Sequence, residues 1–240
     1  MVNNLNTGFY KDLDTNFELA LEMSQQDFSD ETLINMLKTG NIPEKQIAAL
    51  SLNSIKNEAD AKVLVDNLTG CEGKIREAVA LRINRAITEQ PETAGYFNQA
   101  ETFAKASIDI NGNICRLVID SVSFLIKNET FCEKYKSLIL NYIQEAFEEL
   151  DKFIFRDKKY VINKQLFKLY WSLEALKLFA DKMNYSELYP IIKRSSEERE
   201  YTIREKAAQI IIILNTEKFS EILEQLKKDE NYYVRNACKN

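Results

Sequence analysis

The chain has 240 residues, of which 45% are hydrophobic and 29% charged, and its 32 basic and 37 acidic side chains leave a net charge of −5. It contains no histidine, which excludes Ser-His-Asp and Cys-His nucleophile systems and H-E-x-x-H metal sites. With only six glycines and three prolines for its turns, the composition predicts long helices and an all-α fold.

The sequence shows no feature that directs the chain out of the cytoplasm. Its first residues lack the basic start and apolar core of a secretory signal. The longest apolar run, Ile210 to Leu214, is far shorter than the roughly 20 residues of a membrane span. The four cysteines are widely separated and form no disulfide framework. We therefore expect a cytoplasmic protein that does not insert into a membrane.

Amphipathic segments of two kinds alternate along the chain. An acidic segment within residues 1–29 is expected to form a capping helix. After it, segments of the first kind carry apolar residues at helical spacing over 30–38, 59–68, 131–153, 185–193 and 217–226. Pro43 and Pro91 mark helix starts, and Thr130-x-x-Glu133 predicts a capping box.

The second kind of segment is a repeat. Ile203-Arg204-Glu205-Lys206-Ala207-Ala208 is similar to Ile75-Arg76-Glu77-Ala78-Val79-Ala80, and Val234-Arg235 opens a third copy. Looser copies open at Ile42, Ile114 and Val161. The six starts, at 42, 75, 114, 161, 203 and 234, are 33, 39, 47, 42 and 31 residues apart, which is the range of helical-repeat proteins. In the 203 copy, four consecutive isoleucines predict a helix that is covered on both flanks.

This pattern resembles the HEAT-repeat family over roughly residues 30–240. The resemblance rests on the apolar-Arg pair at Arg76, Arg204 and Arg235, followed by alanine, and on Pro190 in the preceding segment. It implies a right-handed α-solenoid of about five helix pairs plus a partial C-terminal repeat, in one continuous domain over residues 30–240. We expect the three arginines to be structural and to bond acidic groups or helix-end carbonyls between repeats.

Helix 158–179 carries the candidate binding surface. Besides a leucine-rich core stripe, it has a second stripe with Tyr160, Lys164, Phe167 and Trp171, the single tryptophan, and Lys168 adds to a basic region over 152–182. Aromatic residues beside a cation are typical of binding hot spots. HEAT-like proteins present their second helices on the concave surface. The alternatives are that the stripe is core and that the basic region is a solvated face balanced by its acidic neighbour, 129–151.

These features favour a non-catalytic scaffold or adaptor that binds another protein, such as an acidic peptide or surface, through its concave face. We expect no cofactor and no metal, since Tyr160-x-x-x-Lys164 lacks the Gly-rich turn of a dinucleotide site. Nucleic acid is a poor fit to an acidic chain. Two alternatives stay open, a HEAT-like alkylpurine DNA glycosylase, which should have a basic groove with aromatics and a carboxylate, and a HEAT-like bilin lyase. The oligomeric state is also open.

Overall fold

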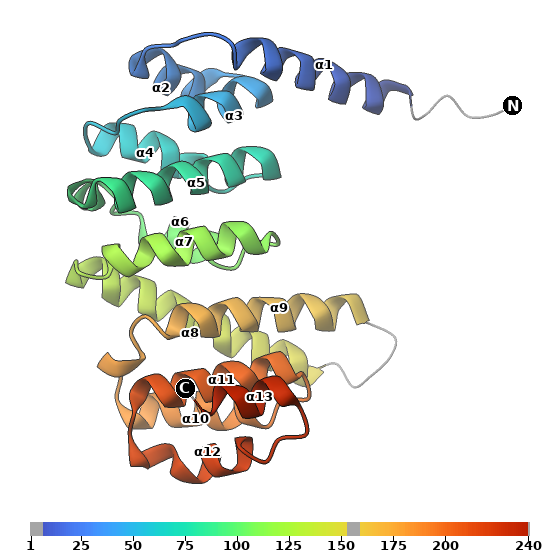
Figure 1. Ribbon diagram of the computed structural model, residues 1–240, viewed down its shortest axis with the longest axis vertical. Helices are drawn as coiled ribbons and strands as arrows, with labels where there is room; N and C mark the ends of the chain where they lie inside the picture. Colours follow the sequence, from blue (N-terminus) through green and yellow to red (C-terminus); the bar gives the residue numbers. More distant parts are fainter. Residues whose placement is uncertain (1–6, 153–158, 240) are drawn as a thin grey trace, which may run out of the picture. The chain divides into compact units, whose positions relative to one another are not determined.

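The computed structural model describes residues 7–152 and 159–239, and all regular secondary structure in these ranges is helical (Figure 1). Side chains are described over 15–152 and 162–239. The predicted all-α class is confirmed. None of the helices in the described ranges is both long and apolar enough to cross a membrane. The contacts divide the chain into two compact units, residues up to 106 with 111–127, and residues 107–110 with 128 onward, so the range 30–240 is shared between them.

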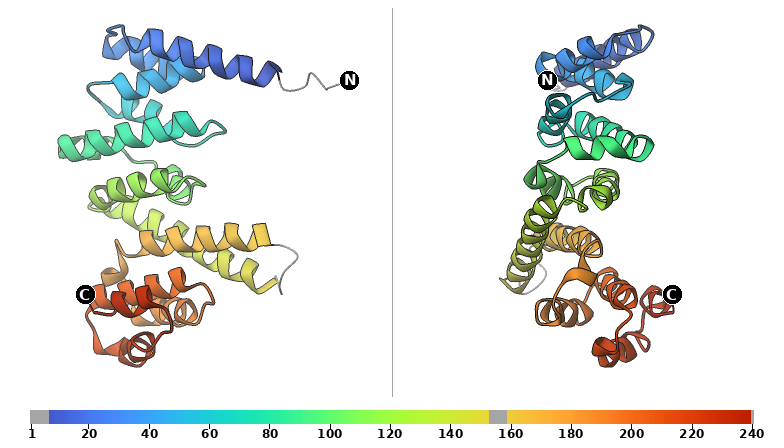
Figure 2. Two further views of the ribbon diagram at one scale, coloured as in Figure 1. Left: turned by 45° about the vertical axis from the view of Figure 1, so that its right-hand side comes forward. Right: turned by 90° about the vertical axis from the view of Figure 1, so that its left-hand side faces the viewer.

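The first unit consists of two rows of helices (Figures 1 and 2). Its first row is α1 (Thr7–Met23), α3 (Ile42–Ser51), α5 (Gly73–Glu89) and α7 (Gly112–Leu125). Its second row is α2 (Asp30–Thr39), α4 (Glu58–Asp66) and α6 (Ala100–Ala106), with the 3-10 helix η1 (Pro91–Tyr96) after α5. Each helix contacts the next one in its own row, and α2 and α6 also pack against α3 and α7.

The second unit repeats this arrangement. Its helices are α8 (Glu129–Lys152), α9 (Lys159–Leu176), α10 (Tyr185–Ser196), α11 (Tyr201–Leu214), α12 (Ser220–Leu226) and α13 (Tyr232–Ala237), with 3-10 helices η2 (Ala180–Lys182) and η3 (Glu217–Phe219). Helices α9, α11 and α13 pack in one row, while α8 packs on α9 and α10 on α11. The second helices of the repeat thus begin within two residues of the starts expected from the sequence.

Apolar side chains between the two rows form the core of each unit. Burial of one such side chain stabilises the fold by roughly 1.5–3 kcal/mol. The fully buried residues include Leu33, Leu37, Leu64, Val79, Phe103 and Val122 in the first unit, and Tyr135, Leu169, Leu173, Phe179, Ile192 and Ile203 in the second. Both kinds of amphipathic segment therefore bury their apolar face against each other.

The three arginines of the repeat make the same local contact. Each guanidinium donates a hydrogen bond to the backbone carbonyl six residues earlier, in the turn that joins the two helices of its pair. The bonds run from Nη1 of Arg76 to Gly70 (2.7 Å), of Arg204 to Glu198 (2.9 Å) and of Arg235 to Asp229 (2.6 Å). These carbonyls lie in the turn beyond the end of the preceding helix, so each arginine closes the turn in front of its own helix.

Arg204 also connects two successive helix pairs. Its Nε and Nη2 donate to the two carboxylate oxygens of Asp229, at 2.7 and 3.0 Å, and both side chains are almost buried. The hydrogen bond from Arg204 holds the pKa of Asp229 below its ordinary value. The planar guanidinium can serve the turn carbonyls and the carboxylate at once, which an ammonium group cannot.

We expect Arg204→Lys to lower the free energy of unfolding by about 2 kcal/mol, because several charge-assisted hydrogen bonds are lost together. Urea denaturation followed by circular dichroism measures this change. The exposed Arg116 of α7 provides the control, since Arg116→Lys should change stability by less than about 0.5 kcal/mol. Equal stability of wild type and Arg204→Lys would contradict a structural role for Arg204.

Two helix starts differ from the sequence prediction. The capping box at Thr130 is wrong, because α8 begins at Glu129 and the side chain of Asn128 accepts the hydrogen bond from the Phe131 amide, at 3.1 Å. Asparagine is as good an N-cap as threonine, so the sequence pattern was ambiguous. Helix α6 was not predicted at all, since seven residues are too few to show a helical period.

The isoleucine run of α11 is covered except at its end. Ile210 and Ile211 are buried and Ile212 is half-buried, but Ile213 is 49% exposed. The helix ends one residue later, where Asn215 takes the left-handed conformation with φ of 44°. The expectation that neighbours cover the run on both flanks is therefore wrong at its last turn.

Candidate binding site

A pocket opens in the second unit where α9 meets the beginning of α11. Asn163, Leu166 and Tyr170 follow one another at three or four residues, and Asn163, Phe167 and Trp171 at four, so all five share one face of α9. Glu200 and Thr202, at the start of α11, lie opposite this face. Together these residues line a cavity of about 340 Å³, which is at the small end of the range of ligand pockets.

Three aromatic rings form a corner of this pocket. The ring of Tyr170 stands almost perpendicular to that of Trp171, at 85° with centroids 5.2 Å apart. The ring of Phe167 is inclined to Trp171 by 64° at 6.2 Å and is 37% exposed. The Nε1 of Trp171 is buried with no acceptor among the described residues, so ring packing alone orients this indole. The inclined rings line one side of a pocket that is open to solvent.

The charge at the pocket is negative. Glu200 is the charged residue among the described lining residues, and its half-buried carboxylate accepts a hydrogen bond of 3.4 Å from Thr202. No basic side chain of the described lining lies opposite it. The pocket therefore offers a carboxylate and π-electron surfaces, which together favour a cation.

Beneath the pocket, Tyr170 already contacts a cation. The Nζ of Lys206 lies 4.4 Å from the centroid of the Tyr170 ring and 2.5 Å from a carboxylate oxygen of Glu174. Burial works against the charge of Lys206, but the hydrogen bond and charge of Glu174 outweigh it and raise the pKa of the lysine. Burial likewise opposes ionisation of Glu174, yet hydrogen bonds from Lys177 and Lys206 lower its pKa.

Of the side chains predicted to form the binding stripe, the structure brings Phe167 and Trp171 together. Lys168 points elsewhere, since its Nζ pairs with Glu145 of α8 at 2.6 Å and lies 4.9 Å from the centroid of the Tyr142 ring. Lys164 is exposed on α9 and does not line the pocket. Tyr160 lies within α9, but its side chain is outside the described residues.

Sequence reasoning missed Tyr170, Glu200 and Thr202. Tyr170 could have been found, because it follows Phe167 by three residues and therefore shares its helix face. Glu200 and Thr202 reach the pocket only through the packing of α11 on α9. No spacing within one helix reports such a contact.

Further aromatic residues extend from the pocket along the same row of helices. Tyr201 follows Glu200 and stacks on Tyr233 of α13, with centroids 6.1 Å apart. Tyr233 and its neighbour Tyr232 are 58% and 60% exposed. We call the whole set, Phe167, Tyr170, Trp171, Tyr201, Tyr232 and Tyr233, the aromatic strip.

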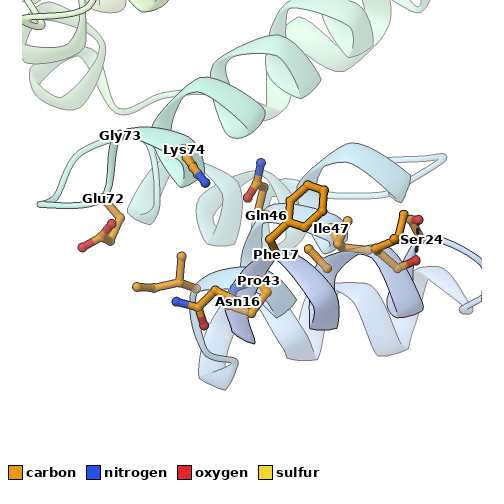
Figure 3. A pocket seen from close by; sticks show the side chains of 12 residues that line it. Asn16, Phe17, Ser24, Pro43, Gln46, Ile47, Glu72, Gly73 and Lys74 are labelled. Carbon is orange, nitrogen blue, oxygen red and sulfur yellow. Dashed lines mark hydrogen bonds between the residues drawn. The ribbon is translucent and has the colours of Figure 1, made fainter. Parts of the chain in front are cut away.

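The first unit has a larger groove of a different kind (Figure 3). It has a volume of about 830 Å³ and lies between α1, α3 and the start of α5. Phe17 extends from α1 toward Gln46 and Ile47 of α3, and it is 66% exposed. Glu72 and Lys74 stand on the other side of the groove and carry opposite charges. The groove is mainly apolar and its two charges offset each other, so it selects no ligand class.

Comparison with known proteins identifies no relative that names a function. No model of a known protein family matches the chain, and no curated protein matches it. The chain is similar to the crystal structure of an engineered protein, a target of the Northeast Structural Genomics Consortium. The two share 13% sequence identity over 89% of this chain and 94% of the other, with a TM-score of 0.46.

Proposed function

We propose that the chain is a HEAT-like, right-handed α-solenoid that acts as a non-catalytic scaffold and binds another protein through the second helices of its repeat, on a concave face. Two findings support the repeat. Helices pair as α2/α3 through α10/α11, with a shorter last pair α12/α13. The same arginine closes the turn of three of these pairs, at Arg76, Arg204 and Arg235.

The observation that carries the binding function is the aromatic strip. Large aromatic side chains lie on three successive second helices: Phe167 on α9 and Tyr232 and Tyr233 on α13 are exposed, and Tyr201 on α11 is half-buried. Tyrosine and tryptophan are enriched at protein interfaces because they provide a large contact area at a small cost in conformational entropy. A contiguous exposed aromatic surface is a typical mark of an interaction site.

The proposal is tested by placing a photo-reactive phenylalanine analogue on the strip, at Phe167 and, separately, at Tyr233. Irradiation in the native cell extract should cross-link the same partner protein from both positions. The control is the analogue at Ile213, which is similarly exposed on α11 but outside the strip. A cross-link of equal yield from Ile213, or none from the strip positions, would contradict binding through the strip.

One observation favours a second candidate, the alkylpurine DNA glycosylase. Such an enzyme is expected to place a carboxylate beside aromatic rings, as Glu200 lies beside Tyr170 and Trp171. Against it, no basic side chain is among the described residues that line the pocket, and Lys206 beneath it is already paired with Glu174. Binding to a DNA duplex at low and moderate salt separates the two candidates, since tight and steeply salt-dependent association would favour the enzyme.

A further inference from the structure

We infer that the corner formed by Phe167, Tyr170, Trp171 and Glu200 binds a methylated lysine side chain of the partner protein. This inference rests on the proposed protein-binding function and specifies the group that the strip recognises. The rings supply the first part of the argument. A quaternary ammonium group is attracted to aromatic faces and buries its methyl groups against them, and several inclined rings can contact it at once. The angles of 85° and 64° to Trp171 give this arrangement.

Charge supplies the second part of the argument. The carboxylate of Glu200 lies at the corner, where it favours a cationic over an acidic or neutral occupant, while it also interacts with the charge of Arg204. The buried ammonium of Lys206 beneath the pocket is neutralised by Glu174 at 2.5 Å, so it repels a second cation little. Its position over the Tyr170 ring shows that this ring already accepts a cation in the folded protein.

Hydration distinguishes a methylated from an unmodified lysine. An unmodified ammonium group is a compact, strongly hydrated charge that needs three hydrogen-bond acceptors when it leaves water. Most of the lining consists of aromatic and apolar side chains, so the pocket replaces few of those hydrogen bonds. Methylation keeps the charge of the lysine and removes N–H donors. The methylated group therefore loses fewer hydrogen bonds to water when it enters the pocket.

The position of the corner indicates a side chain of a protein as the source of the methylammonium group. The pocket is open, and next to its lining residue Glu200 the half-buried Tyr201 stacks on the exposed Tyr233. A long lysine side chain can reach into the corner while the main chain of the partner lies along the rest of the strip. A free small molecule such as choline would use only the corner.

The single tryptophan makes the test direct, because Trp171 is itself part of the corner and its fluorescence reports occupancy. The first probe is the N-acetyl amide of trimethyllysine, and the second is its neutral isostere with a tert-butyl group. We expect a saturable change in emission with the first probe only. Phe167→Ala and Glu200→Gln should each weaken its binding by about 5- to 30-fold. Ile213→Ala, which is outside both the pocket and the aromatic strip, should leave it unchanged.

Peptides complete the test. A peptide that carries one trimethyllysine should bind more tightly than its unmodified form, and also more tightly than choline. The inference is overturned by equal responses to the charged probe and the neutral isostere, by tighter binding of choline, or by preference for an acidic peptide. Thermal melts of each variant establish that it is folded. If the strip still cross-links a partner while the methylated probes fail, the inference is wrong and the proposed function stands; loss of the cross-links alone removes the function.

Discussion

Tyr135→Ala is expected to lower the free energy of unfolding of the second unit by about 3–5 kcal/mol, because it removes a large side chain from the core and leaves a cavity. Tyr135 is fully buried in α8, where it stacks on Phe131 and meets the ring of Phe179 edge-on. Its hydroxyl is 2.8 Å from that of Ser107, which is also buried. One side chain thus connects α8, the segment after α9 and residues 107–110.

Urea denaturation of Tyr135→Ala, Tyr135→Phe and Tyr232→Ala separates the contribution of the Tyr135 ring to stability from that of its hydroxyl group. Tyr135→Phe keeps the ring and loses the hydroxyl, so we expect it to lower the free energy of unfolding by about 1–2 kcal/mol. Tyr232→Ala removes an equal ring from the surface and should cost less than about 1 kcal/mol. A loss for Tyr135→Ala no larger than that for Tyr232→Ala would contradict the core assignment.

We expect Glu174→Ala to lower the free energy of unfolding by a similar amount. The carboxylate of Glu174 on α9 accepts hydrogen bonds from Lys177 at 2.7 Å and from Lys206 of α11 at 2.5 Å. The Lys206 side chain is only 7% exposed, whereas that of Lys177 is 22% exposed and can turn to water. Removal of the carboxylate leaves the buried ammonium of Lys206 without its countercharge, which costs about 3–5 kcal/mol.

The contribution of this ion pair should depend on pH in two windows. The pKa of Glu174 is lowered in the folded protein, so its contribution is complete above the ordinary glutamate pKa and is lost as pH falls through the lowered value. The pKa of Lys206 is raised, so its contribution is complete below the ordinary lysine pKa and is lost as pH rises through the raised value. The stability difference between wild type and Glu174→Ala should therefore be largest from about pH 5 to pH 10.

The double variant Glu174→Leu/Lys206→Met is the matched control. It removes both charges together and fills their volume with apolar groups, which is often neutral or stabilising for a buried pair. We expect it to be more stable than Glu174→Ala at neutral pH and to lose the pH dependence of the pair. If the double variant is less stable than Glu174→Ala, the stability that Glu174→Ala loses does not come from the uncompensated charge of Lys206.

The repeat could be predicted from the sequence because its signal is local. The apolar period of each helix and the arginine near the start of its second helix recur at Ile75, Ile203 and Val234, and the helices begin close to these positions. Short elements carry no such signal. Helix α6 has seven residues and η1 only six, and both are held by contacts with longer helices that no pattern within them reveals.

Part of the candidate site could be predicted from the sequence. Helical spacing placed Phe167 and Trp171 on one face, and the same rule extends to Tyr170. The rule does not apply to Lys168, which was expected at the site because of the basic region over 152–182 and whose side chain pairs with Glu145 of the neighbouring helix. It could not supply Glu200, whose place at the pocket depends on how α11 packs against α9. The sequence also suggested an acidic partner, whereas this carboxylate favours a cationic group.

The arginine-closed turn has an evolutionary consequence. Each arginine completes its turn with a carbonyl only six residues away, so the turn needs nothing from the rest of the chain. The helices before these turns differ in length, with twelve residues in α10, nine in α4 and seven in α12. A duplicated helix pair would bring with it the arginine that closes its own turn. Such a gene can gain or lose a helix pair in one step and still encode properly closed turns.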